Sequence, residues 1–202
     1  MNDIYFDHAA TTPMDPEVIK TIDYYMKNYY GNPSSIYETG QEANNELQKA
    51  RQSLADFINA SDFREIIFTS GGSESDNLAI KGTALAYQDK GNHIITTKIE
   101  HHAVLHTCEY LEKHHGFEVT YLDVDEQGFV SVSDLKDAVC EETILVSIMT
   151  ANNEIGTIQP IQAIGEFLKE KDIIFHTDAV QAIGQLKVDV QKMNIDLLSA
   201  SA

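Results

Sequence analysis

From about residue 66 onward the chain repeats one pattern, a short apolar run followed by a longer stretch with helical spacing of apolar residues. The runs do not alternate polar with apolar residues, which indicates strands buried on both faces. A helix between two such strands connects them in parallel through a right-handed crossover. The pattern therefore predicts an α/β fold, a mostly parallel sheet flanked by helices on both faces.

The expected strands cover residues 66–69, 93–97, 117–122, 144–149, 173–176 and 195–199, and the expected helices between them cover residues 74–87, 103–114, 133–140 and 161–171. Ahead of this region, Asp15 is suited to cap a helix that begins at Pro16 and stops near Gly31. Residues 32–35 form a loop, and residues 42–58 have the spacing of an amphipathic helix.

Composition excludes several classes of partner. The chain has 14 Lys and Arg against 32 Asp and Glu, a net charge of −18, and the cations do not cluster. This balance disfavours nucleic acid and membrane surfaces as partners. The start has no signal-peptide pattern and no apolar run reaches membrane-spanning length, so a cytoplasmic location is expected. Cys108 and Cys140 have no zinc-site spacing and are expected to be free, buried thiols.

The chain stops at residue 202, directly after an apolar strand. A strand placed last leaves a face and an edge uncovered, and natural domains avoid this. The sequence is therefore expected to be a fragment, incomplete at the C-terminus.

Polar segments follow the expected strands at the edge where ligands collect in open parallel sheets. They are residues 69–74, 100–102, 152–156, 176–181 and 199–202. The first has two glycines and a serine before a helix, which can cradle a phosphate but is equally an ordinary helix cap. It does not have the P-loop pattern. The 152–156 segment is either a binding loop or a polar turn.

The histidine and acid in these segments allow more than one chemistry. His101 could act as a general acid or base, stack on a planar ring, or be half of a solvated histidine pair with His102. His102 and His106 are four residues apart, but no third ligand is apparent, so no metal site is expected. Asp178 emerges at the end of a buried strand and should face a cation, for which a protonated ring nitrogen would serve.

Together and in order, the motifs resemble the NifS-like cysteine desulfurases, fold-type-I, pyridoxal-phosphate-dependent class V aminotransferases. The resemblance covers essentially the whole chain and rests on YFDHAATTP (5–13), GNPSS (31–35), TSGGSESDN (69–77), EH (100–101), NNEIG (152–156), HTDAVQ (176–181) and SASA (199–202). It implies that residues 15–202 form the large cofactor-binding domain, while residues 1–14 are an arm that belongs to the small domain.

The resemblance also implies how pyridoxal 5'-phosphate (PLP) would be held at its phosphate end. Gly72 and Ser73 would bind the phosphate through backbone N–H and hydroxyl groups, joined by Ser201. The resemblance implies no metal.

At the ring end, His101 would stack on the pyridine ring and act as the catalytic proton shuttle. Asp178 would pair with the pyridinium nitrogen, which lets the ring accept electrons released at the substrate Cα. Gln181 would bind the phenolic oxygen, and Asn153 would reach the same region or the substrate carboxylate.

The implied reaction takes L-cysteine to L-alanine and passes the sulfur to an enzyme thiolate as a persulfide, for iron–sulfur cluster assembly or related pathways. A homodimer and sulfur-acceptor proteins are the implied partners. The chain departs from the family because it stops before the Schiff-base lysine, the persulfide-forming cysteine and the arginine that clamps the substrate carboxylate. Neither Cys108 nor Cys140 stands in the expected place.

Alone, these 202 residues are therefore expected to be inactive and to bind PLP only weakly. A selenocysteine lyase or another class V aminotransferase shares the same motifs. An alternative of another class is a non-catalytic α/β binding domain in which the motif residues are only caps and turns.

Overall fold

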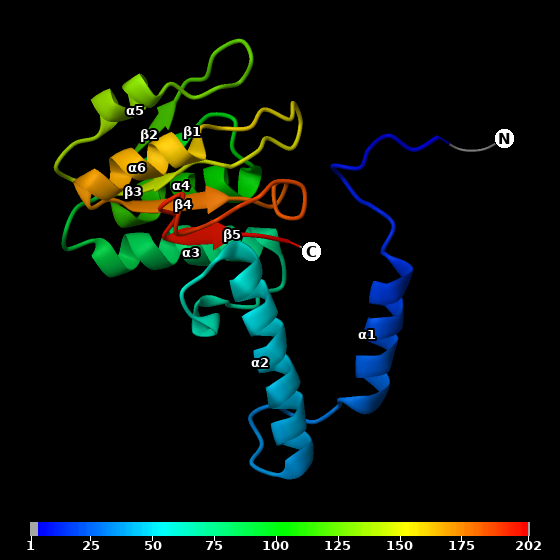
Figure 1. The fold of residues 1–202 in the computed structure, drawn as a ribbon. Coiled ribbons are helices and arrows are strands. Elements are labelled where there is room, and N and C mark those ends of the chain that lie inside the picture. Colours follow the sequence, from blue (N-terminus) through cyan, green and yellow to red (C-terminus); the bar gives the residue numbers. More distant parts are fainter. Residues whose placement is uncertain (1–3, 202) are drawn as a thin grey trace. The chain divides into compact units, whose positions relative to one another are not determined.

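The computed structural model describes residues 4–201. The chain divides into two compact units, Met1–Ile67 and Phe68–Ala202 (Figure 1). Each unit is considered by itself. The boundary that we expect after residue 14 stays a prediction.

The first unit contains α1 (Pro16–Asn28), α2 (Glu38–Ile58) and the 3-10 turn η1 (Phe63–Glu65). The predicted cap of the first helix is confirmed, because Asp15 Oδ1 accepts the backbone N–H of Glu17 at 2.7 Å. The second helix begins before the expected residue 42 and ends at Asn59, which has a left-handed backbone. Asparagine is one of the few residues that accept this conformation readily.

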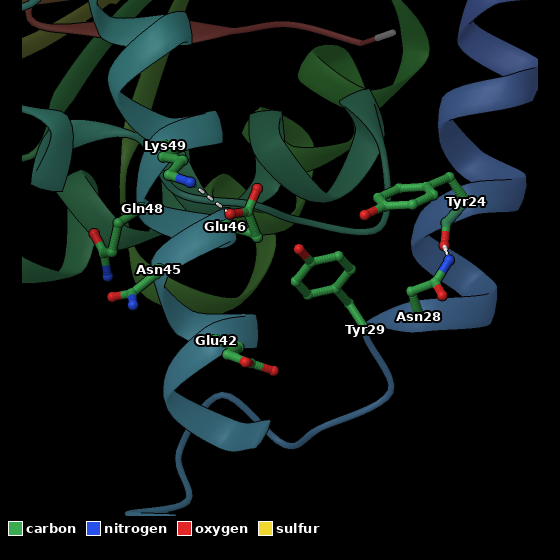
Figure 2. A pocket seen from close by; sticks show the side chains of 8 residues that line it. All are labelled: Tyr24, Asn28, Tyr29, Glu42, Asn45, Glu46, Gln48 and Lys49. Carbon is green, nitrogen blue, oxygen red and sulfur yellow. Dashed lines mark hydrogen bonds and ion pairs between the residues drawn. The ribbon is translucent and has the colours of Figure 1, made fainter. Parts of the chain in front are cut away.

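A polar hollow of ≈ 530 Å³ lies between α1 and α2 (Figure 2). The Glu46 carboxylate in this hollow accepts hydrogen bonds from the Tyr25 hydroxyl and from the Lys49 ammonium group, each at 2.6 Å. Its lining consists of Tyr24, Asn28, Tyr29, Glu42, Asn45, Glu46, Gln48 and Lys49. None of the site residues expected from the sequence is among them.

The strand expected at residues 66–69 is wrong. Within the described chain these residues pair with no strand, and Ile67 and Phe68 are 67% and 47% exposed. A β-rich run becomes a strand only where a neighbouring strand takes its N–H and C=O groups. Local sequence does not supply that neighbour.

The second unit has a five-stranded, all-parallel sheet in the order β2-β1-β3-β4-β5, which confirms the predicted fold class. Its strands are β1 (His93–Thr97), β2 (Glu118–Leu122), β3 (Thr143–Ser147), β4 (Ile174–Asp178) and β5 (Leu197–Ser199). Its helices are α3 (Gly72–Tyr87), α4 (His102–His115), α5 (Val132–Ala138) and α6 (Ile161–Lys171).

Helices cover both faces of the sheet (Figure 1). A hydrophobic core lies on each face, as the apolar strands predict. Ile94 and Leu145 belong to the core under α3 and α4. Their neighbours Ile95 and Val146 belong to the core under α5 and α6. All four are fully buried, so consecutive strand residues are apolar because each face is covered.

One cysteine is not where we expect it. Cys108 is on the buried face of α4, but Cys140 is exposed in the turn between α5 and β3. Its Sγ lies 3.5 Å from Nδ1 of His93. A turn residue lies beyond the core, so the expected burial of Cys140 is wrong. Along residues 4–201, none of the helices combines the length and apolarity needed to cross a membrane.

Candidate active site

The carboxyl ends of the parallel strands gather the loops that carry the expected site residues at one edge of the sheet. Three contacts tie these loops together. The Asn152 side chain donates to the carbonyl of Ile99 at 2.8 Å, and the Met149 N–H donates to Glu100 Oε1 at 2.9 Å. The N–H of Thr150 binds the carbonyl of Asp178 at 2.8 Å. The loops after β1, β3 and β4 therefore form one connected region.

Asp178 is the last residue of β4 and is only 6% exposed. Its Oδ1 accepts the backbone N–H of Val180 at 2.9 Å. Burial raises the pKa of this carboxyl, while the Val180 hydrogen bond and the charge of His101 act in the opposite direction. No Lys or Arg within residues 4–201 forms an ion pair with Asp178. A carboxyl this buried favours a cationic ligand.

Gly72 begins α3 and lies directly beside the loop after β4. A Cβ built on Gly72 would come within 2.9 Å of Val180 Cγ2, so only glycine fits here without displacement. The preceding Gly71 has φ 154°, in the region that favours glycine. The first N–H groups of a helix lack intrahelical partners and attract anions. Ser73, in the same first turn, is exposed.

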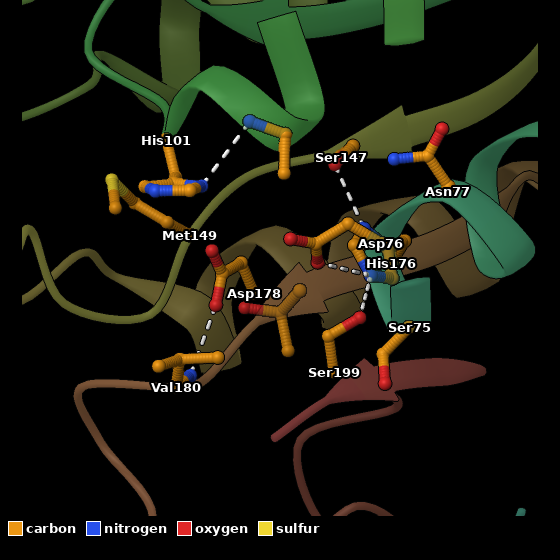
Figure 3. Close-up of polar contacts among 12 residues, drawn as sticks. Ser75, Asp76, Asn77, His101, Ser147, Met149, His176, Asp178, Val180 and Ser199 are labelled. Carbon is orange, nitrogen blue, oxygen red and sulfur yellow. Dashed lines mark hydrogen bonds and ion pairs between the residues drawn. The ribbon is translucent and has the colours of Figure 1, made fainter. Parts of the chain in front are cut away.

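His101 caps the start of α4. Its Nδ1 accepts the N–H of Ala103 at 3.1 Å, which fixes the orientation of the ring. Figure 3 shows this ring beside Met149 and near the carboxyl group of Asp178. His102 and His106 stack at 5.3 Å. Among the described residues, no group of three or more His, Cys, Asp or Glu side chains could hold a metal ion.

The other expected residues lie in loops at this edge. Asn153 is half-buried in the turn after β3, Gln181 is half-buried in the turn after β4, and Ser201 is exposed just after β5. The turn after β3 is held by the side chain of the neighbouring Asn152. Its Oδ1 accepts the backbone N–H groups of Glu154 and Ile155 at 2.9 and 3.0 Å.

Three buried ionisable residues behind the site were not assigned a role from the sequence. They are Asp76 on α3, Glu100 after β1 and His176 on β4. Burial, together with the charge of Asp178, raises the pKa of Asp76 to about 7. Burial alone lowers the pKa of His176 to about 3. Burial, with smaller contributions from the charges of Asp178 and Asp76, raises the pKa of Glu100 to about 8, although Met149 and Thr97 donate to this carboxyl.

The sequence holds one signal that could have found Asp76. Asp76 lies one helical turn after Gly72. Ile80, about one turn further along, is on the buried face of the same helix. An acid on the core-facing stripe of an amphipathic helix indicates a buried polar partner. The local sequence pattern does not indicate which partner this acid contacts.

Comparisons with known proteins agree with this geometry. The family described as Aminotransferase class-V matches residues 4–202. A cysteine desulfurase IscS from Clostridium botulinum is 59% identical over 98% of this chain and 50% of the relative. A putative cysteine desulfurase IscS 1 from Bacillus subtilis is 57% identical over 100% of this chain and 52% of the relative.

Solved structures show the same fold. One described as SspA in complex with cysteine aligns with a TM-score of 0.93 and 44% identity, covering 98% of this chain and 56% of the other. A NifS-like protein aligns with a TM-score of 0.93 and 42% identity, covering 98% and 54%. The chain spans about half the length of the curated relatives it matches. The sequence match, the fold and the placement of the strand-end residues together mean that this chain belongs to the aminotransferase class-V family.

Proposed function

We propose that the protein carrying this chain is a PLP-dependent cysteine desulfurase and that the sheet edge described above is its cofactor site. Relatives at 59% and 57% identity are named cysteine desulfurases, and one structural neighbour is described in complex with cysteine. The observation that carries the proposal is the buried carboxyl of Asp178, which has no Lys or Arg partner in the described chain.

Two features of the structure fit PLP. Asp178 is a buried acid suited to a protonated ring nitrogen, and the N-terminus of α3 is suited to a phosphate. Gly72 and Asp178 both contact Val180, so the two ends of the site are linked through a single residue. When bound, PLP supplies an electron sink for carbanion chemistry at the substrate Cα.

At the phosphate end, the N–H groups of Gly72 and Ser73 and the Ser73 hydroxyl bind the anion, with the hydroxyl of Ser201 as a third contribution. The arrangement needs no lysine, because helix N-terminal N–H groups carry partial positive charge. The absence of a Cβ on Gly72 keeps the backbone of α3 close to Val180.

At the ring end, Asp178 holds a proton on the ring nitrogen. His101 would stack on the ring face and act as the proton shuttle. Its Nδ1 accepts the N–H of Ala103, so in the neutral ring the hydrogen is on Nε2. Gln181 binds the phenolic oxygen, and Asn153 binds in the same region or holds the substrate carboxylate. Each of these roles is inferred from the position of the residue at this edge of the sheet and from the chemistry of its side chain.

The overall reaction converts L-cysteine to L-alanine and transfers sulfur to an enzyme thiolate as a persulfide. We place residues 15–202 in the large PLP-binding domain and residues 1–14 in an arm of the small domain. A homodimer, sulfur-acceptor proteins as partners and a cytoplasmic location belong to the same proposal.

The test compares two Asp→Asn variants at opposite ends of β4, made in the protein that carries this chain. Asp178→Asn should lower L-alanine formation by at least ~10²-fold, since an electrostatic partner of the reacting group is lost, and should leave phosphate-dependent PLP uptake measurable. Asp172→Asn is the control, because Asp172 is an exposed helix cap with a left-handed backbone that asparagine accepts. Absence of PLP uptake by the unmodified protein, or wild-type turnover by Asp178→Asn, would refute the proposal.

A further inference from the structure

A network of buried polar side chains crosses the sheet behind Asp178 (Figure 3). His176, fully buried in β4, lies at its centre. Its Nδ1 is 2.8 Å from Ser147 Oγ on β3, and its Nε2 is 3.0 Å from Ser199 Oγ on β5. Asp76 Oδ1, from α3, lies 3.7 Å from the same Nε2. One histidine thus links three strands and a helix.

The direction of the hydrogen bonds follows from the chemistry of the groups. When Asp76 is ionised, the Ser199 hydroxyl donates to its carboxylate, so the Ser199 oxygen accepts the hydrogen of His176 Nε2. His176 is neutral because burial lowers its pKa to about 3, and it carries only one ring hydrogen. Nδ1 then accepts from the Ser147 hydroxyl. In that state the bonds run in one direction from β3 to the carboxyl on α3.

We propose that Asp76 and His176 are positioning residues for Asp178: they hold its carboxyl group at a fixed separation from the N-terminus of α3, and Asp76 places no second charge beside it near neutral pH. This inference rests on the proposed function. Asp76 stands one turn after the phosphate-binding start of α3, and His176 stands two residues before Asp178 on β4. Ser199 bonds to both side chains, so it links the two ends of the cofactor site.

The negative charges of Asp76 and Asp178 repel each other. Burial and the Asp178 carboxylate together raise the pKa of Asp76 to about 7, so near neutral pH the two carboxyls do not both carry a full charge. Protonation of Asp76 leaves Asp178 free to hold the negative charge that a ring nitrogen needs. Asp76 therefore adds its own charge beside Asp178 only above about pH 7, and an uncharged substitute removes that late ionisation.

Titratable groups face this pair from several neighbouring elements. At the start of α4, the charge of His101 lowers the pKa of Asp178. On β4 the groups are His176 and Asp178 themselves, while β3 and β5 face Asp76 with serine hydroxyls only. After β1, Glu100 is buried, its pKa is raised to about 8 by burial, and it is protonated near neutral pH. From α4, which packs against α3, Cys108 contributes a thiol whose pKa burial raises to about 12.

The test uses Asp76→Asn and His176→Gln in the protein that carries this chain, with His93→Gln as the matched control. His93 is also a buried histidine bonded to hydroxyls on both ring nitrogens, Thr143 at 2.7 Å and Thr120 at 2.8 Å, but it lies at the amino end of β1. Two quantities are measured: the titration curve of the Asp178 carboxyl by carbon-13 NMR without cofactor, and the dissociation constant of PLP.

In the unmodified protein the Asp178 signal should show a second step near pH 7, where Asp76 ionises beside it, and Asp76→Asn should remove that step. His176→Gln should weaken PLP binding by ~10-fold, whereas His93→Gln should leave both quantities unchanged. A purely structural role would lower thermal stability in all three variants but leave the PLP affinity and the second step of the Asp178 curve unchanged, and that result would overturn the inference.

Ser199→Ala provides a milder break in the same network if Asp76→Asn does not fold, and it should weaken PLP binding in the same direction as His176→Gln. Unchanged PLP affinity in this variant would also overturn the inference. The NMR titration needs no cofactor, so it separates the two proposals. If the unmodified protein takes up no PLP, the proposed function fails, while the Asp178 titration curve still reports whether Asp76 ionises beside it near pH 7.

Discussion

Gly72 and Val180 lie so close together that a methyl group on Gly72 would come 2.9 Å from Val180 Cγ2. Val180 also donates its backbone N–H to Asp178 Oδ1 at 2.9 Å. The start of α3 and the end of β4 are therefore in direct contact. A displacement of either one moves the other, so the proposed phosphate-binding and ring-nitrogen-binding ends of the site are coupled through this contact.

Gly72→Ala should weaken PLP binding by ~10-fold, because a shift of a few tenths of an ångström at a packed contact displaces the phosphate-binding N–H groups. The affinity is measured by titration of the protein with PLP. Gly82→Ala, on the same helix but with open space around it, is the control. It should bind PLP normally and raise helix stability by up to ~1 kcal/mol. Equal PLP affinity in both variants would contradict the proposed role of Gly72.

Alanine substitutions of Asn152 and Asn153 should have different effects, the first on stability and the second on ligand binding. Asn152→Ala loses the bond to Ile99 and leaves the turn N–H groups without their acceptor, so the free energy of unfolding should fall by ~1–3 kcal/mol. Asn153→Ala should change it by no more than ~0.5 kcal/mol but should weaken binding of PLP or L-cysteine. Urea unfolding and binding titrations of both variants provide the comparison. The reverse outcome, with binding lost only in Asn152→Ala, would remove Asn153 from the site.

Glu100 should make the protein less stable as the pH rises. Burial raises its pKa from 4.5 to about 8, so the folded state keeps a proton that the unfolded state loses within this window. Its contribution is fully present below about pH 4.5 and is lost as the pH rises towards 8. The pH ranges over which Asp76 and His176 change the stability end near pH 7. The step in stability between about pH 7 and about pH 8 therefore reports on Glu100.

Glu100→Gln removes this titration and keeps an acceptor for Thr97 and Met149. Over that step the unmodified protein should lose ~1 kcal/mol more stability than the variant. Unfolding in urea at the two pH values measures the difference. Glu126→Gln, an exposed acid in a loop, controls for the change in net charge. Parallel pH profiles for the unmodified protein and Glu100→Gln would show that Glu100 does not hold its proton in the folded state.

The fold class could be predicted because strand and helix periods are local properties. Ile94 and Ile95 are both apolar, and they face different cores, so the run itself indicated a sheet covered on two sides. Residues 66–69 show the limit of that reasoning, since their composition is β-rich but no partner strand is present in the described chain. Cys140 shows the same limit for burial, because a thiol after a short helix can end in solvent.

The sequence by itself determined the α/β pattern, the cap at Asp15 and the positions of Gly72, His101 and Asp178 at element ends, because each depends on neighbours within a few residues. Only the tertiary structure decided that Asp76 meets His176, a hundred residues away. Parallel pairing brings strands that are distant in the chain into register, and burial then forces their polar side chains to find partners. Those partners depend on the packing of the whole sheet, which no short segment encodes.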